Sequence, residues 1–252
     1  MTAHEYLKSV IAKYSLTESE AAEAEIIRGT VEDVLIRSYG PKIDRSMTMV
    51  QYHKMTAGEA FFDIEIVVHF ENDSFGTAKG MYDSVFNLMS RFYDTVKHRF
   101  STCVSIGEHR IRILSVRIID KVTMAGEIYD RCRSCPLRTN VFRQREYVRW
   151  SMHRDAVSLM RIWKYCNDVD FGTFPLDLIT IQVLSDESSD RLDVQMTKVL
   201  EFLRYHINDL VLKDPGNVEN DVAGSLSSTD RKIVNIEACF SLSKTRWMDI
   251  VW

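Results

Sequence analysis

The alternation of apolar and polar residues is clearest between positions 62 and 70, where the chain reads FDIEIVVHF. A period of two predicts a strand, because successive side chains of a strand point to opposite faces. Asp63 and Glu65 then share one face, and the apolar residues between and after them point to a core. Two adjacent carboxylates repel each other, and a strand that carries them typically holds cations such as magnesium. The alternative is a half-exposed amphipathic strand with two solvated acids.

Helical periodicity accounts for the segments on either side of this strand. Thr17 and Glu20 form a capping-box pattern that opens a long helix after a short one, and the segment at Gly40-Pro41 ends it. A stripe of apolar residues predicts a later helix. The expected elements of this half are helices within 3–39 and at 78–99, and strands near 47–52, 62–70, 101–106 and 110–122.

The second half of the chain shows helical periodicity only. Helices are expected near 153–168, 174–186, 189–208 and 229–243. The pattern predicts an α/β (α+β) protein with two lobes: a mixed-sheet lobe with N-terminal helices at 1–150, followed by an all-helical lobe at 151–252. A cleft between two such lobes is the usual place for a ligand.

Composition places the chain among ordinary globular proteins. It has 252 residues, 45% of them hydrophobic, which is ample for a core. No stretch approaches the roughly 20 apolar residues of a membrane span, and the N-terminus has no signal-peptide layout. We therefore expect no membrane partner and a cytoplasmic or nuclear location. The five cysteines, an odd number, are expected to be reduced thiols.

The charge is uneven along the chain, although the formal net charge is −4. Seven arginines lie between Asp130 and Arg154, against only Asp130 and Glu146. This arginine-rich segment could attract the phosphates of RNA, or a protein partner, and the alternative is a solvated basic connector. The arginines are Arg131, Arg133, Arg138, Arg143, Arg145, Arg149 and Arg154.

A third carboxylate, Asp120, ends the predicted strand RIRILSVRIID. If that strand lies beside the acidic one, Asp120 completes a three-carboxylate cluster with Asp63 and Glu65. Such a cluster holds two divalent cations, which bridge a nucleoside triphosphate and activate an attacking hydroxyl. The alternative is a surface residue at a strand end.

These residues resemble the polymerase-β-like nucleotidyltransferases, in the branch of oligoadenylate synthetase, cyclic GMP-AMP synthase, bacterial cyclic-oligonucleotide synthases and archaeal CCA-adding enzymes. The acidic strand of that family reads Asp, apolar, Asp or Glu, apolar, as DIEI does here. Its upstream Tyr, Lys, Thr pattern resembles YHKMTA, and its helical-lobe motifs resemble SLMRIWKYCN, TFPLDL and KDPGNVENDVAGSL. The matches span about 17–226.

The resemblance implies transfer of a nucleotidyl group from a nucleoside triphosphate to a hydroxyl of a nucleotide or an RNA end. Asp63, Glu65 and Asp120 would be the catalytic and metal-binding residues, with Mg²⁺ or Mn²⁺ as cofactor. Nucleotide binding would fall to a second group, in which Lys164 grips the triphosphate and Thr173 donates a hydrogen bond to it. That group is Gln51, Lys54, Thr56, Lys164 and Thr173.

One departure from the family pattern separates two functional hypotheses. Val50-Gln51 stands where the family has Gly-Ser, and a β-branched residue with a long amide should crowd the phosphates. The alternative function is therefore a catalytically impaired module of the same fold that binds nucleotide, RNA or a protein partner. A separate possibility is zinc at Cys132 and Cys135, which needs two further ligands, for which only His153 and Cys166 are plausible.

Overall fold

A computed structural model gives the structure of the protein for residues 1–44, 49–54 and 62–252; for 49–54 and Phe62 only the backbone is described. The chain divides into two compact units. We call Leu16–Val141 the α/β unit, and Met1–Ser15 together with Phe142–Trp252 the helical unit. Residues 1–15 fall in the helical unit because α1 (Ala3–Lys13) packs with α5 and α7 of the second half.

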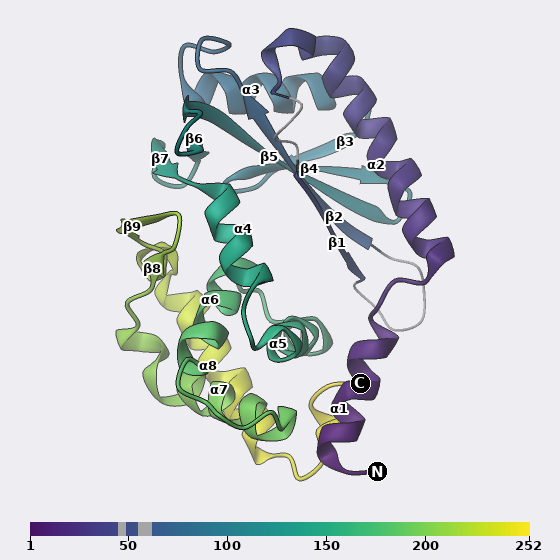
Figure 1. Cartoon of the computed structure of the whole chain (residues 1–252), viewed down its shortest axis with the longest axis vertical. Helices are drawn as coiled ribbons and strands as arrows, with labels where there is room; N and C mark the ends of the chain where they lie inside the picture. The colour runs from purple at the N-terminus through teal and green to yellow at the C-terminus, as the bar shows by residue number, and fades with distance from the viewer. Residues whose placement is uncertain (45–48, 55–61) are drawn as a thin grey trace. The chain divides into compact units, whose positions relative to one another are not determined.

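The α/β unit forms a seven-stranded mixed sheet within the described residues (Figure 1). The strand order is β1-β2-β5-β4-β3, and a hairpin of β6 and β7 continues from β5. Neighbouring strands are antiparallel except β2 and β5, which are parallel. The strands are β1 (Met49–Lys54), β2 (Phe62–Phe70), β3 (Asp94–Lys97), β4 (Ser101–Ile106), β5 (His109–Asp120), β6 (Ala125–Asp130) and β7 (Cys135–Thr139).

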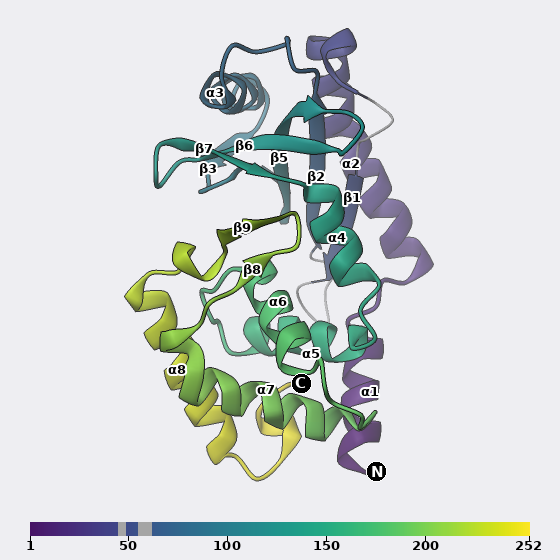
Figure 2. The same cartoon turned by 60° about the vertical axis from the view of Figure 1, so that its left-hand side comes forward.

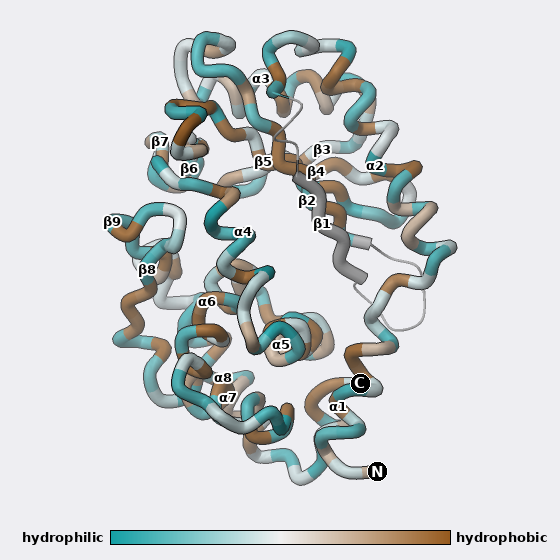
Figure 3. Tube along the Cα trace, viewed as in Figure 1, coloured by the Kyte–Doolittle hydropathy of each residue, from teal (hydrophilic) through white to brown (hydrophobic). Residues whose placement is uncertain are grey.

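Two helices, α2 (Glu18–Tyr39) and α3 (Ala78–Met89), cover one face of this sheet. The covered face carries the apolar residues of β2 that alternate with the acids, including Ile64 and Ile66, both fully buried. The capping box predicted for α2 is present, with the Thr17 and Glu20 side chains each accepting the other's backbone N–H. Figure 3 shows how hydrophobic and hydrophilic residues alternate along α2.

The helix predicted from 78 to 99 ends ten residues earlier, at Met89. Residues 94–97 instead form β3, which pairs with β4. Phe92 and Val96, two apolar residues within the range of the predicted helix, are 60% and 55% exposed. The β-branched residues Thr95 and Val96 favour the extended conformation, so this short segment forms a strand and not a helix.

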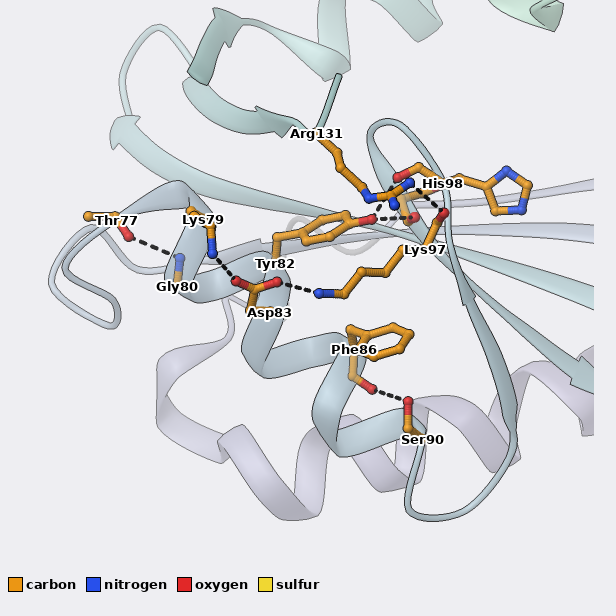
Figure 4. A network of polar contacts seen from close by, with 11 residues as sticks. Thr77, Lys79, Gly80, Tyr82, Asp83, Phe86, Ser90, Lys97, His98 and Arg131 are labelled. Atoms are coloured by element: carbon orange, nitrogen blue, oxygen red, sulfur yellow. Dashed lines mark hydrogen bonds and ion pairs between the residues drawn. The ribbon is translucent and has the colours of Figure 1, made fainter. Parts of the chain in front are cut away.

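A polar network ties α3 to the β3–β4 edge (Figure 4). The Tyr82 hydroxyl donates to the backbone carbonyl of His98 at 2.6 Å, and Asp83 pairs with both Lys79 and Lys97 at 2.6 Å. The Lys97 ammonium lies 4.5 Å from the centre of the Phe86 ring. Cation, ring and carboxylate together hold α3 against this edge.

The helical unit is a bundle of four helices from the second half together with α1. Figure 2 shows α7 and α8 side by side, as their contacts require. The buried Trp163 indole donates to the Ser241 hydroxyl at 2.8 Å, which joins α5 to α8. The helices are α5 (Arg154–Cys166), α6 (Thr173–Val183), α7 (Leu192–His206) and α8 (Ser228–Ser243), with α4 (Val141–Arg149) before them and a hairpin of β8 (Lys213–Asp214) and β9 (Asn217–Asp221) before α8.

The segment expected as a connector, 125–152, is ordered secondary structure: β6, β7 and α4. Arg133 and Arg138 pair there with Asp130 and Glu127, at 4.0 and 3.2 Å. Two of its arginines thus pair with acids of the hairpin. Among the described residues, no helix is long and apolar enough to cross a bilayer.

Candidate functional site

The acidic end of β2 has the predicted alternation. Asp63 is 4% exposed and Glu65 is half-buried, and both lie on the sheet face opposite the α2–α3 core. Their shared face follows from the period of two along an extended strand. The sequence therefore placed these two carboxylates on the correct face.

Arginines of β5 lie level with these acids. In the parallel register of β2 and β5, Asp63 is opposite Arg110 and Glu65 is opposite Arg112. The Arg112 Nη2 atom lies 2.7 Å from Asp63 Oδ2. The two side chains form an ion pair in which Asp63 is nearly buried. The positive charge that balances Asp63 is thus supplied by the protein itself.

Cys103 of β4 is paired with Arg112 of β5, and the charges near the acids change the pKa of its thiol. Burial raises the pKa of Cys103, and the nearby Asp63 carboxylate raises it further, while Arg112 and Arg110 oppose the increase. The buried thiol is held in its neutral form and is a poor nucleophile.

Asp120 does not join this cluster, which corrects the expectation of a three-carboxylate site. Asp63 is level with position 110 of β5, so Asp120 lies about 30 Å further along the strand at its usual rise. There its carboxylate accepts the Val122 N–H at 2.8 Å and the Thr123 hydroxyl at 2.7 Å. These hydrogen bonds, of which that from Thr123 has the largest effect, lower the pKa of Asp120. Asp120 thus caps the turn between β5 and β6.

The altered Gly-Ser position lies in a strand. Val50 and Gln51 belong to the backbone of β1, opposite Ile66 and Glu65 of β2. Both residues thus lie within the short strand predicted over 47–52. The side chains of Gln51 and Lys54, and the whole of Thr56, lie outside the described residues.

In the helical unit, the motif residues belong to α5 and α6. Lys164 lies near the end of α5, and Thr173 is the first residue of α6. Arg161 and Asp177 form a bidentate ion pair between these helices, with N–O distances of 2.7 and 2.6 Å. Asp177 is 3% exposed, so this pair fixes α5 against α6.

The motif KDPGNVENDVAGSL forms the β8–β9 hairpin. Asp214, 1% exposed, accepts hydrogen bonds from the Gly216 N–H at 2.7 Å, the Gln144 amide at 2.9 Å and the Asn220 amide at 3.1 Å. These bonds close the hairpin and join it to α4. Asp214 of the late motif thus has a structural role.

Cys132 and Cys135 lie at the turn of the β6–β7 hairpin, and both thiols are free and exposed. His153 and Cys166, the further zinc ligands considered from the sequence, have other neighbours. Cys166 lies 3.4 Å from the Tyr14 hydroxyl, and His153 lies 3.4 Å from the Gln195 amide.

Solved structures with this architecture exist, at low sequence identity. The CD-NTase CdnG of Bradyrhizobium diazoefficiens, in complex with GTP, matches with a TM-score of 0.69 at 12% identity, over 96% of this chain and 94% of that one. The chain has the nucleotidyltransferase fold. The cyclic dinucleotide synthase CdnE of Elizabethkingia meningoseptica matches with a TM-score of 0.64 at 8% identity, covering 97% and 100%. Cid1, an RNA terminal uridylyl transferase, matches at 0.62 and 8%, covering 97% and 94%.

No protein-family model matches the sequence, and no curated protein matches it. The likeness is therefore one of fold. It confirms the resemblance proposed from the sequence motifs and the mixed α/β class.

The described residues do not fit the two-metal centre that the nucleotidyltransferase fold implies. No group of three or more His, Cys, Asp or Glu among them could hold a metal ion. The strand next to the acids offers Arg110 and Arg112 at their level, and a guanidinium repels a cation. In the sequence, the alternation in RIRIL indicates that Arg110 and Arg112 share one face of a strand. That these arginines lie level with Asp63 depends on the pairing register of β2 and β5, which local sequence does not show.

Proposed function

We propose that the chain is a nucleotidyltransferase-fold module that binds a nucleoside triphosphate and lacks a two-metal centre. The observation that carries the proposal is the ion pair of Asp63 with Arg112. An acid that is neutralised by a guanidinium has little remaining attraction for a cation. GTP in the CdnG structure, and ATP in the structure of CdnC from E. coli MS115-1, support the class of ligand.

In the helical unit, we assign the triphosphate to Lys164 and Thr173. The Thr173 Oγ1 atom is buried and has no hydrogen-bond partner among the described residues. A buried hydroxyl without a partner is costly, so a phosphate oxygen is a fitting acceptor. The Arg161–Asp177 ion pair holds α5, which carries Lys164, against α6, which begins at Thr173.

Nucleotidyl transfer with Mg²⁺ or Mn²⁺ is the second candidate function. The observation in its favour is that Asp63 and Glu65 share one face of β2, as the chemistry requires. This function requires the Arg112 guanidinium to leave Asp63, which breaks a nearly buried ion pair and is costly.

The substitution Arg112→Asp tests the proposal. It removes the guanidinium and adds a third carboxylate beside Asp63 and Glu65, so tight Mn²⁺ binding should appear where the unmodified protein shows none without nucleotide. Electron paramagnetic resonance of free Mn²⁺ measures the difference. Arg37→Asp, at an 82% exposed side chain of α2, is the control for net charge and should leave Mn²⁺ binding unchanged.

Product analysis with α-labelled triphosphates completes the test. The unmodified protein should give no oligonucleotide or cyclic product in magnesium or manganese. Brisk turnover by the unmodified protein, together with two tightly bound Mn²⁺ ions, would show that it is a metal-dependent transferase after all.

A further inference from the structure

The helix α4 and Trp150, which follows it, expose three aromatic rings, while the helix buries Val141 and Arg145. On the inner side, Arg145 is 8% exposed and Gln144 donates to the buried Asp214. On the outer side, Phe142, Tyr147 and Trp150 are 41%, 46% and 68% exposed. Packing within the described chain gives no reason for rings on this side.

Guanidinium groups accompany these rings. Arg143, Tyr147 and Trp150 are spaced by four and three residues, so they line one side of the helix. The Arg149 guanidinium carbon lies 5.2 Å from the centre of the Trp150 ring. Around these rings, Arg143 and Arg149 are both exposed. The acid beside them is Glu146, whose carboxylate lies 3.8 Å from the Arg149 guanidinium, so the net charge around the rings is positive.

The Trp150 ring is already held in place. Its indole N–H donates to the Glu146 carboxylate at 2.5 Å, and its backbone N–H continues the helix by bonding to the Glu146 carbonyl at 2.9 Å. Arg149 covers the ring from one side, yet the residue stays 68% exposed. A fixed, exposed ring loses little conformational entropy when a planar group stacks on it.

We infer that this α4 stripe, made of Arg143, Tyr147, Arg149 and Trp150, binds single-stranded nucleic acid. Exposed rings stack on bases whatever the sequence, and neighbouring arginines take the phosphates. A duplex hides the faces of its bases, so stacking requires a single strand. The charge around the rings favours this polyanion over an apolar protein surface.

The test is fluorescence anisotropy with labelled 15-nucleotide oligomers of RNA and of DNA that carry 5′-hydroxyl ends. These ends carry no triphosphate, so the result does not depend on the nucleotide site proposed above. Trp150→Ala should weaken binding by about five- to 150-fold, the range for loss of one stacked base. Phe240→Ala removes a 58% exposed ring on α8 and should change nothing.

The salt dependence separates stacking from charge. Each phosphate contact contributes about −0.7 to the slope of log affinity against log salt for a single strand. Arg149→Gln should therefore make the slope about 0.7 less steep, whereas Trp150→Ala should leave it unchanged. Arg37→Gln on α2 is the matched control.

Tyr147→Ala provides a second removal of a ring, should Trp150→Ala disturb the fold. Absence of binding at about 50 mM salt, or equal affinity of both ring variants and the unmodified protein, would overturn the inference. Self-association that depends on Trp150, with no affinity for the oligomers, would overturn it in favour of a protein contact.

Discussion

Arg112 sets the electrostatics at the acidic end of β2. Its guanidinium pairs with Asp63 at 2.7 Å, on the face that Asp63 shares with Glu65. A carboxylate at this position of β5 would increase the repulsion between acids and require cations, whereas an arginine removes that requirement. Arg112 thus gives this end of β2 a self-neutralised ion pair.

Lys164 is the residue of the helical unit whose proposed role is most directly testable. Lys164→Ala should weaken triphosphate binding about tenfold or more, because a charge-assisted contact contributes about 1.5–3 kcal/mol. Isothermal titration with GTP and ATP measures this. The control is Lys244→Ala, at an exposed residue after α8. Equal affinities of the two variants would remove Lys164 from the site.

Asp130 provides a prediction for pH. Burial would raise its pKa, but hydrogen bonds from Arg99 and from the Arg133 and Cys132 N–H groups outweigh burial and lower it. Because the folded-state pKa lies below the unfolded value of about 3.9, this stabilisation is present above that value and is lost as the pH falls through the folded-state pKa.

We therefore expect Asp130→Asn to lower the free energy of unfolding by about 1.5–3 kcal/mol at pH 6. The deficit should shrink in strong acid, where the native carboxyl is protonated too. Urea unfolding at pH 6 and at about pH 2.5 measures both values, provided that both proteins remain folded at the lower pH. A deficit that does not change with pH would contradict the ion-pair account.

At the scale of elements, the close approach of β6 to β5 depends on Gly126. A Cβ atom there would clash with the Val116 side chain and lie 3.1 Å from the Arg117 carbonyl oxygen. Gly126→Ala should therefore destabilise the protein by about 1–3 kcal/mol, the usual cost of overpacking. Thermal unfolding measures this, and Gly76→Ala, with open space around its Cα, is the control. Similar melting temperatures for the two variants would contradict the predicted clash.

The elements that the sequence predicted well are those with strong local signals. The capping box at Thr17 and Glu20 set the start of α2, and the alternation around Asp63 identified β2. The β6–β7 hairpin escaped because charged residues interrupt its pattern, and Pro136 weakens a strand assignment except at an edge, where β7 lies. Such a strand is stabilised mainly by its pairing, which local sequence does not show.

At the scale of the whole molecule, the motifs predicted the fold but not the composition of the site. Asp63 and Glu65 fell on one face as expected, because alternation is local. Asp120 was misplaced because its position relative to Asp63 depends on the register between β2 and β5. The same register brings Arg112 to Asp63. It therefore explains both why Asp120 is absent from the site and why Arg112 is present there.

The central claim is that a nucleoside triphosphate binds without a two-metal centre. The most direct measurement is isothermal titration of the unmodified protein with GTP and ATP, once in excess Mg²⁺ and once in EDTA. We predict binding in both conditions, with dissociation constants that agree within about threefold, a difference below 0.7 kcal/mol. A loss of more than about tenfold in EDTA, or no binding in either condition, would contradict the account.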